Sequence, residues 1–308
     1  MQTILGAGGS IGIELAKALP KYTSEIRLVS RNPRKINDTD EVFSADLLNS
    51  NDVNKAVDGS EVIYLTAGLQ YNTRVWQEQW PIVMNNAIEA CKAHGAKLVF
   101  FDNVYMYDRT AIKHMTEKTP VRPSTDKGRV RETIANMVTE AHEKGDIKAL
   151  IARSADFLGP ANSVPTEMIY KNMVKGKAGQ WLSSLDKVHS LIDTYDAGLG
   201  TAMLGNAETA YGEVWHLPTD NTPLTGRQWI ELFAKEMNKK PKAKAIPTWL
   251  LGIIGMFVPV MKEMKEMIYQ YEDDYYFDST KFNRRFEYKP STPEVSVKRV
   301  VDYFSHLK

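Results

Sequence analysis

The sequence predicts an α/β protein, built on a doubly wound parallel sheet and accompanied by a smaller α+β lobe. Two observations support this prediction. The first 160 residues alternate between short apolar runs and stretches of helical periodicity, and a glycine-rich turn joins the first run to the first helix. Apolar strands separated by helices are typical of a parallel sheet covered on both faces. We expect one domain over residues 1–160 and a lobe over 161–308, from which a segment at about 188–217 returns to the sheet.

The expected elements follow the chain in order. Strand-like runs occupy 2–5, 25–29, 41–45, 61–67, 97–101 and 148–152, and helical stretches occupy 11–19, 52–57, 75–94 and 129–144. Asn51 is expected to cap the helix at 52–57, and Gly59 and Gly95 are expected to end the helices that precede them. Past Gly159 the alternation weakens. Helices are expected at 164–175, 196–204, 225–239 and 293–307, strands at 188–192 and 214–217, and a solvated lysine-rich connector at 239–244.

Charge and cysteine content exclude several classes of protein. Lys and Arg total 39 against 38 Asp and Glu, so no long-range field attracts nucleic acid, and none is expected as a partner. The single cysteine, Cys91, excludes an internal disulfide and a cysteine metal cluster, and the six histidines show no paired metal-ligand spacing. We therefore expect no metal site and a cytoplasmic protein.

The longest uncharged apolar run, residues 249–261, is too short to cross a bilayer, which takes about 20 residues. No membrane span is therefore expected, and the N-terminus lacks the basic region of a signal peptide. Two interpretations of the run stay open. It can form a buried or partner-facing helix, or a helix on a membrane surface beside Lys262 and Lys265.

The turn after the first strand carries the strongest functional pattern. Gly6, Gly9 and Gly12 are spaced three apart, between a strand and a helix. Such glycines permit a sharp turn, a close backbone approach to a pyrophosphate and tight packing of helix on strand. With Gly8, Ser10 and Ile11, they would present helix N–H groups to the phosphates of a dinucleotide in a Rossmann-type domain. The alternative is a glycine-rich turn that binds nothing.

The end of the second strand favours NADP over NAD, although NAD stays possible. A carboxylate usually binds the ribose 2′-hydroxyl at this point, whereas this chain has Ser30, Arg31 and Arg34. A guanidinium can bind a 2′-phosphate with two hydrogen bonds. The alternative is that both arginines are solvated loop charges.

Two further strand ends suit the cofactor. Asp46 and Leu47 follow the third strand, where a carboxylate could accept from the adenine amine and an apolar side chain could cover the ring. Thr66, Ala67 and Gly68 end the fourth strand with small residues that let backbone pass close to a ribose. An aspartate after a strand is, alternatively, an ordinary turn residue.

Motifs along most of the chain resemble the extended short-chain dehydrogenase/reductase family, of the NAD-dependent epimerase/dehydratase type. They are the glycine turn at 6–12, Ala-Asp-Leu at 45–47, Val-Tyr-Met-Tyr at 104–107, and the segments at 152–160, 191–197, 212–216 and 277–281. The resemblance implies a Rossmann-type domain, a nicotinamide dinucleotide and a substrate lobe. It places Ser154 at the cofactor, and Tyr71, Asp156, Asn162 and His189 at the substrate.

The catalytic motif of that family is altered. Family members carry Ser or Thr after the fifth strand and Tyr-x-x-x-Lys about 24 residues later, where the tyrosine moves the proton and the lysine holds the ribose. Here Asn103 stands at the Ser position, Lys127 at the Tyr position and Arg131 at the Lys position. Arg131 can bind ribose hydroxyls but cannot act as an acid or base. Alternatively, Lys127 and Arg131 lie on an exposed polar helix face.

Tyr105 is the expected proton donor. If the chain after the fifth strand stays extended, its side chain leaves on the same side as that of Asn103, which would orient the substrate oxygen. Tyr71 is a second candidate. The expected function is that of an NADP-dependent oxidoreductase or epimerase-like enzyme acting on a small carbonyl or sugar-like substrate. The alternative is a catalytically degenerate NAD(P)-binding sensor or regulatory protein.

A homodimer is also expected, through the helices at 75–94 and 129–144. Each offers small apolar residues that would be spare if only one helix face packs on the sheet. The alternative is that all of them pack on the sheet. These residues are Val83, Ala87, Ala90, Ile134, Met137, Val138 and Ala141.

Overall fold

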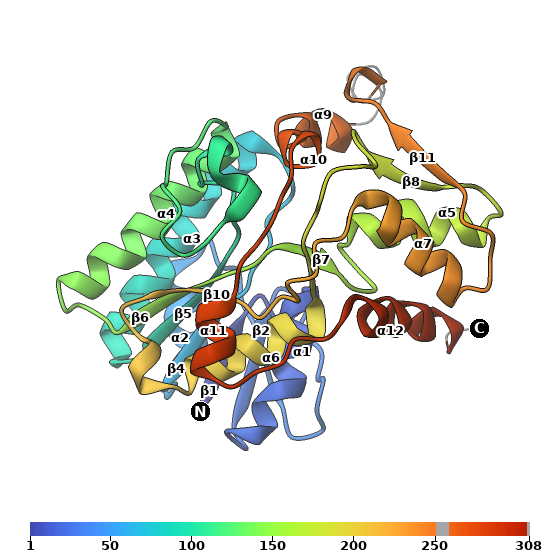
Figure 1. Cartoon of the computed structure of the whole chain (residues 1–308). Helices are drawn as coiled ribbons and strands as arrows, with labels where there is room; N and C mark the ends of the chain where they lie inside the picture. The colour runs from blue at the N-terminus through green and yellow to red at the C-terminus, as the bar shows by residue number, and fades with distance from the viewer. Residues whose placement is uncertain (251–258, 307–308) are drawn as a thin grey trace. The chain divides into compact units, whose positions relative to one another are not determined.

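The computed structural model describes residues 1–250 and 259–306, and the chain divides into two compact units (Figure 1). The first unit comprises Met1–Met106, Asp126–Ser154 and Thr194–Leu217, and the second comprises Tyr107–Thr125, Ala155–Asp193 and Pro218–Lys308. The expected boundary at residue 160 thus falls inside the second unit. The chain passes repeatedly from one unit to the other.

The first unit is built on a seven-stranded sheet in the order β10-β6-β5-β4-β1-β2-β3. Every pairing in it is parallel, which confirms the doubly wound α/β prediction. The strands are β1 Gln2–Leu5, β2 Ile26–Ser30, β3 Glu41–Ser44, β4 Val62–Leu65, β5 Lys97–Asp102, β6 Ala149–Arg153 and β10 Val214–His216.

Helices of the first unit form two groups. Helix α1 packs against α6, while α3 packs against α2 and α4. The strands between them read as apolar runs because side chains on both sides of the pleat are buried, as in β4. The helices are α1 Ser10–Ala18, α2 Ser50–Ala56, α3 Thr73–His94, α4 Asp126–Glu143 and α6 Thr194–Gly205, with 3-10 turns at Leu19–Lys21 and Glu208–Ala210.

The prediction that Asn51 caps α2 is wrong, because the helix begins earlier. Asn49 has extended backbone angles, and its side chain accepts hydrogen bonds from the N–H groups of Asn51 and Asp52. The prediction that Gly95 ends α3 is confirmed. Gly95 adopts a left-handed φ of 64°, and its N–H donates to the carbonyl of Cys91.

The apolar stripe expected at a dimer interface packs inside the first unit instead. Val83 and Ala87 of α3 are each 1% exposed, and Ile134 of α4 is fully buried. Ala90, Val138 and Ala141 are buried as well, and Met137 is half-buried against the same core. This correction has a simple cause: α3 and α4 pack on each other as well as on the sheet. The dimer stays a prediction without this support.

The second unit contains two small parallel sheets, β7 Asp156–Leu158 with β9 Leu191–Asp193 and β8 Gly179–Leu182 with β11 Ala243–Ile246. Its core joins Trp181 of β8 to Phe233 and Val297 from two amphipathic helices, α7 and α12. The helical segments are a 3-10 helix Arg109–His114, a π-helix Thr166–Tyr170, α5 Lys171–Val174, α7 Gly226–Glu236, α9 Pro259–Lys265, α10 Tyr269–Glu272, α11 Thr280–Arg285 and α12 Pro293–Ser305.

Several expectations for the second unit need correction. The strand expected at 188–192 begins only at Leu191, and the expected connector at 239–244 runs into β11 at Ala243. The helix expected at 164–175 is a π-helical segment followed by α5, and α7 ends at Glu236 rather than at 239. Of the apolar run at 249–261, residues 251–258 lie outside the described residues. In the part of the chain that the structure describes, helices are too short or too polar to cross a bilayer.

Candidate functional site

The glycine turn between β1 and α1 is closely packed against its neighbours. Gly6 has φ +98°, and a Cβ built there would lie 2.4 Å from the Cα of Ala67. A Cβ at Gly12 would lie 2.7 Å from the Cα of Ala7 and 2.8 Å from the carbonyl oxygen of Gly6. A side chain at either position would therefore collide with backbone, so both contacts depend on glycine. The turn, Thr66, Ala67 and Gly68 meet at the carboxyl ends of β1 and β4.

An exposed glycine precedes the N-terminus of α1. Within the described residues no side chain caps this helix, and its first turn has no acidic residue. Gly8 is exposed, and a Cβ placed there would have nothing within 4 Å, while the nearest atom to a Cβ at Gly9 would lie 3.6 Å away. The N–H groups in the first turn of an α-helix are not used by the helix's own backbone hydrogen bonds. Together with the helix dipole, they form a site that favours an anion.

The loop after β2 exposes two guanidinium groups. Arg31 and Arg34 are exposed, and neither forms an ion pair within residues 1–250 and 259–306. The loop itself is fixed, because the carboxylate of Asp40 accepts from the N–H groups of Ile36 and Asn37. The side-chain amide of Asn37 donates to the carbonyl of Ala16 at 2.8 Å. The loop is thereby tied to α1, whose N-terminus is the candidate anion site.

Asp46 is a turn residue in the structure. Its Oδ1 accepts from the N–H of Leu48 at 3.0 Å, and its own N–H donates to Asp52. Leu47 is half-buried against the core of the unit, and its carbonyl accepts from the amide of Asn86. These hydrogen bonds give Asp46 a structural role in the turn. Its expected contact with adenine stays a prediction.

Lys127 is completely buried at the start of α4. Its Nζ donates to Oγ1 of Thr73 at 2.7 Å and lies 4.9 Å from the ring centroid of Tyr71. The Tyr71 ring meets Trp76 edge-on at 5.6 Å. The alternative in which Lys127 and Arg131 sit on an exposed helix face is therefore wrong, since both side chains point into the unit.

The chain after β5 turns instead of staying extended. Oδ1 of Asn103 accepts from the N–H of Tyr105 at 3.1 Å, which closes a tight side-chain turn. The premise that both side chains leave on one side of an extended segment is therefore wrong. Tyr105 stacks on Trp76 with 6.2 Å between ring centroids. Tyr71 and Tyr105 consequently contact the same indole, and Tyr71 also lies beside Lys127.

Arg131 forms a buried ion-pair network with Asp102, the last residue of β5. Its Nε donates to Oδ1 of Asp102 at 2.8 Å, and Arg153 approaches Oδ2 at 3.3 Å. The side chains of Arg131 and Asp102 are 4% and 0% exposed. The guanidinium also lies 4.7 Å from the ring centroid of Trp80. Arg131 is thus held by protein groups, and its expected contact with a ribose stays a prediction.

Asp102 also organises its neighbours. Its carboxylate accepts from the N–H of Asn103 at 2.8 Å, and its carbonyl accepts from the N–H of Ser154 at 3.0 Å. Asp102, Thr73 and Trp76 were not predicted from the sequence. An acidic residue ending an apolar strand was the only available signal for Asp102. Nothing in the local pattern distinguished Thr73 or Trp76 from other residues at the start of a helix.

In the second unit, His189 and Asp156 are bound to each other. Nε2 of His189 lies 3.0 Å from Oδ2 of Asp156, and Nδ1 lies 3.2 Å from the carbonyl of Gln270. The imidazole stacks on the rings of Tyr271 and Tyr275 at 4.3 Å and 4.4 Å. Burial, and next the negative charge of Asp156, raise the pKa of Tyr275 well above its ordinary value. The ring of His189 is therefore occupied by protein groups, and a direct substrate contact by this ring does not fit the structure.

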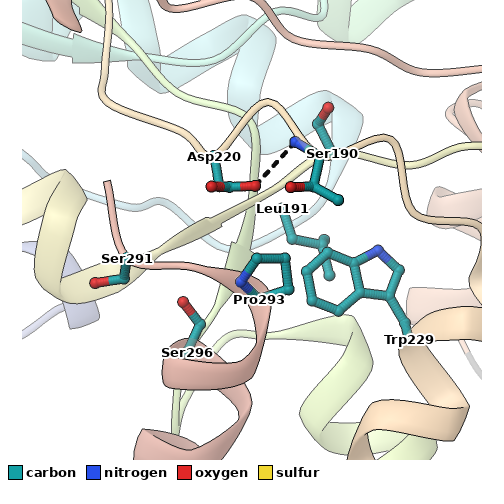
Figure 2. Close-up of a pocket in the computed structure, with 8 residues that line it drawn as sticks. Ser190, Leu191, Asp220, Trp229, Ser291, Pro293 and Ser296 are labelled. Atoms are coloured by element: carbon teal, nitrogen blue, oxygen red, sulfur yellow. Dashed lines mark hydrogen bonds between the residues drawn. The ribbon is translucent and has the colours of Figure 1, made fainter. Parts of the chain in front are cut away.

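Two other features belong to the second unit. Asn162 lies on an exposed loop with a left-handed φ of 55°, a conformation that asparagine tolerates. A small polar pocket, shown in Figure 2, lies between the start of β9 and the N-terminal end of α12. Asp220 and Trp229 line it, and Asp220 accepts from the N–H of Thr222 at 2.8 Å. Across the described ranges, no cluster of His, Cys, Asp and Glu is placed to hold a metal ion.

Comparisons with known proteins agree with this fold. The model of the NAD dependent epimerase/dehydratase family matches residues 3–209. UDP-glucuronic acid 4-epimerase from Bacillus cereus, in complex with NAD, has a TM-score of 0.81 at 16% identity, covering 100% of this chain and 99% of that one. No curated protein matches the sequence significantly.

Two further solved structures are similar. A dTDP-glucose 4,6-dehydratase double mutant from Streptomyces venezuelae, with NAD bound, has a TM-score of 0.78 at 15% identity and covers 99% of this chain and 97% of that chain. UDP-glucose 4-epimerase from Thermus thermophilus, also with NAD, has a TM-score of 0.77 at 15% identity and covers 99% of each chain. At these identities the likeness shows a shared fold.

Proposed function

The chain belongs to the NAD-dependent epimerase/dehydratase family, and from that premise we propose that it is an NADP-dependent oxidoreductase or epimerase-like enzyme acting on a small carbonyl or sugar-like substrate. The observation that carries the proposal is the turn between β1 and α1, where Gly6 and Gly12 leave no room for a side chain and Gly8 is exposed before a helix that no side chain of the described residues caps. The similar structures are described with NAD, which supports a nicotinamide dinucleotide, and their names refer to nucleotide sugars, which supports a sugar-like substrate.

The residues of the turn fit a dinucleotide. The N–H groups of the first turn of α1 would bind the pyrophosphate, and the glycines at 8 and 9 would let it approach the backbone. Thr66 to Gly68 would pass along a ribose, and Asp46 and Leu47 would lie at the adenine. When bound, the nicotinamide would supply or accept a hydride.

Arg31 and Arg34 are the basis for proposing NADP. A 2′-phosphate would give both exposed guanidiniums an anionic partner, on a loop already fixed to α1 by Asn37. We expect NADPH to bind more tightly than NADH. Losing a charge-assisted hydrogen bond is worth about 1.5–3 kcal/mol, so Arg31→Glu should weaken NADPH binding by roughly tenfold or more.

Fluorescence titration of both cofactors tests the preference. Lys35→Glu is the matched control, because Lys35 is an exposed cation on the same loop whose Nζ donates to the carbonyl of Asp38. The control should leave the ratio of the two affinities nearly unchanged. Equal affinities of the unmutated protein for NADPH and NADH would contradict the proposal of NADP.

For proton transfer, the geometry favours Tyr71 over Tyr105. The cation of Lys127 lies over the ring of Tyr71, where it would stabilise the phenolate left when the proton is transferred. Thr73 fixes that ammonium by accepting one of its hydrogen bonds. Tyr105 stacks on the same indole and is the competing donor, for which Asn103 would orient the substrate oxygen.

Paired variants separate the two tyrosines. With a panel of aldehydes, ketones and nucleotide sugars, Tyr71→Phe should lower turnover by about 10²-fold, the usual contribution of a positioned acid. Its affinity for NADPH should stay unchanged. Tyr105→Phe should lower turnover by a smaller factor than Tyr71→Phe. If Tyr105→Phe loses all turnover while Tyr71→Phe stays active, Tyr105 is the proton donor instead.

A binding-only protein is the second candidate, and one observation favours it. Arg131 stands at the position of the family's ribose-binding lysine, yet its guanidinium is paired with Asp102 inside the unit. A sensor would need the dinucleotide site without the proton donor. Tight NADPH binding with no turnover across the whole panel would support this candidate.

A further inference from the structure

The imidazole of His189 has an acceptor at each nitrogen. The carbonyl of Gln270, 3.2 Å from Nδ1, can only accept, so Nδ1 must carry a proton. Nε2 faces Oδ2 of Asp156 at 3.0 Å. Either Nε2 also carries a proton and the two side chains form an ion pair, or the carboxyl group of Asp156 is the protonated partner.

Two observations favour the ion pair. The hydroxyl of Tyr271 donates to the same Oδ2 at 3.0 Å, and an oxygen that receives two donors is best served by an ionised carboxylate. The rings of Tyr271 and Tyr275 stack nearly parallel on the imidazole, with interplanar angles of 17° and 13°. Their ring centroids lie 4.3 Å and 4.4 Å from that of the imidazole, so two such rings on the same face of the imidazole would overlap. The imidazole therefore lies between two aromatic faces, whose negative quadrupole favours a cation.

The surroundings hold this pair in place. His189 is 1% exposed, Trp181 of β8 meets its ring edge-on at 5.6 Å, and the indole of Trp229 donates to its carbonyl. Further titratable and charged groups face the cluster. Burial and, to a lesser extent, Asp156 raise the pKa of Tyr269 of α10. Arg109 lies 5.3 Å from the ring centroid of Tyr269, and Tyr107 interacts with Tyr275. A buried charge without a partner is costly, whereas this one has a carboxylate and a carbonyl.

We propose that His189 is a buried imidazolium that acts as a positioning residue for the carboxylate of Asp156, clamping it to the segment at 269–275. Asp156 begins β7 and keeps a 21% exposed side chain, while both of its donors fall on Oδ2. Its other oxygen, Oδ1, is the one left to accept from a hydroxyl or ammonium group of a ligand. That last role rests on the proposed function, but the clamp does not.

Nuclear magnetic resonance of the full chain, labelled with ¹⁵N at histidine, tests the charge directly. At pH 7 both ring nitrogens of His189 should show the signature of a protonated imidazolium, assigned by its loss in His189→Gln. Asp156→Asn should convert the ring to a neutral form, and Tyr271→Phe, which keeps the stacked ring, should leave it charged. An unprotonated ring nitrogen in the unmutated protein at pH 7 would overturn the proposal.

Hydrogen exchange gives a second readout that needs neither substrate nor cofactor. His189→Phe keeps an aromatic ring between the tyrosines but leaves Asp156 without its cation, so amide protection of 156–158 and 269–275 should fall about 100-fold. Adding Asp156→Asn to His189→Phe should raise the amide protection of these segments again by about tenfold, because the unpaired carboxylate charge is gone. If the loss of protection in the double variant equals the sum of the losses in His189→Phe and Asp156→Asn, in free-energy terms, the ion pair is contradicted. Since these readouts require no turnover, failure of the clamp and failure of the proposed enzyme activity are distinguishable.

Discussion

Replacing Arg131 by methionine distinguishes a structural role from a cofactor role for this residue. Its guanidinium is 4% exposed, pairs with a fully buried carboxylate and lies 4.7 Å from the ring centroid of Trp80. Removing one partner of such a pair leaves the carboxylate of Asp102 with Arg153 and the N–H of Asn103, and costs about 3–5 kcal/mol. For a domain of this size the midpoint of thermal unfolding should fall on the order of 10 °C.

The assay is thermal unfolding followed by tryptophan fluorescence, together with NADPH titration on the same samples. Arg129→Met is the matched control. Arg129 lies in the same helix, but its side chain is 57% exposed and pairs with Asp126 at the surface, where such a pair is worth less than about 1 kcal/mol. If Arg131→Met unfolds at the unmutated midpoint while losing affinity for NADPH, the residue holds the ribose and the structural role is refuted.

Three further predictions concern stability and reactivity. Gly12→Ala should cost about 1–3 kcal/mol, since its Cβ would lie 2.7 Å from backbone, whereas Gly8→Ala should leave the free energy of unfolding nearly unchanged in urea titrations. Asn49→Ala should cost about 1 kcal/mol as a lost helix cap, and Asn51→Ala should cost clearly less. Burial raises the pKa of the Cys91 thiol to about 12, so the folded state keeps a proton that the unfolded chain releases near pH 9. Stability should therefore fall as the pH rises from 9 towards 12, and the thiol should react with a disulfide reagent at pH 8 only after unfolding; rapid labelling of folded protein would contradict this.

The sheet was predictable because its signals are local. A strand buried on both faces has consecutive apolar residues, as at β4. A glycine turn between strand and helix can be recognised from the spacing of its glycines. The resemblance placed Lys127 and Arg131 at the family's catalytic positions, and the sequence alone left an exposed helix face as the alternative. Their partners were not predictable, because Thr73 and Asp102 lie 54 and 29 residues away along the chain.

The remaining misses have similar causes. The geometry of Asn103 and Tyr105 was misjudged because the asparagine side chain competes for the backbone N–H and turns the chain. His189 looked like a ligand contact because its acceptors come from residues 156 and 270, which no local pattern associates with it. Pairings between distant segments are decided by tertiary packing, which a single sequence does not display.

The order of strands in the first unit has a consequence for truncation. β10, which pairs with β6, comes from residues 214–216, after the chain has already passed through the second unit. A fragment ending at residue 160 would contain the glycine turn at 6–12 but would leave one side of β6 without its neighbour. It would also lack α6, against which α1 packs. Such a fragment would expose an unpaired strand edge and an apolar helix face, which invite aggregation. Residues up to about 217 must therefore be synthesised before the first unit can complete its sheet.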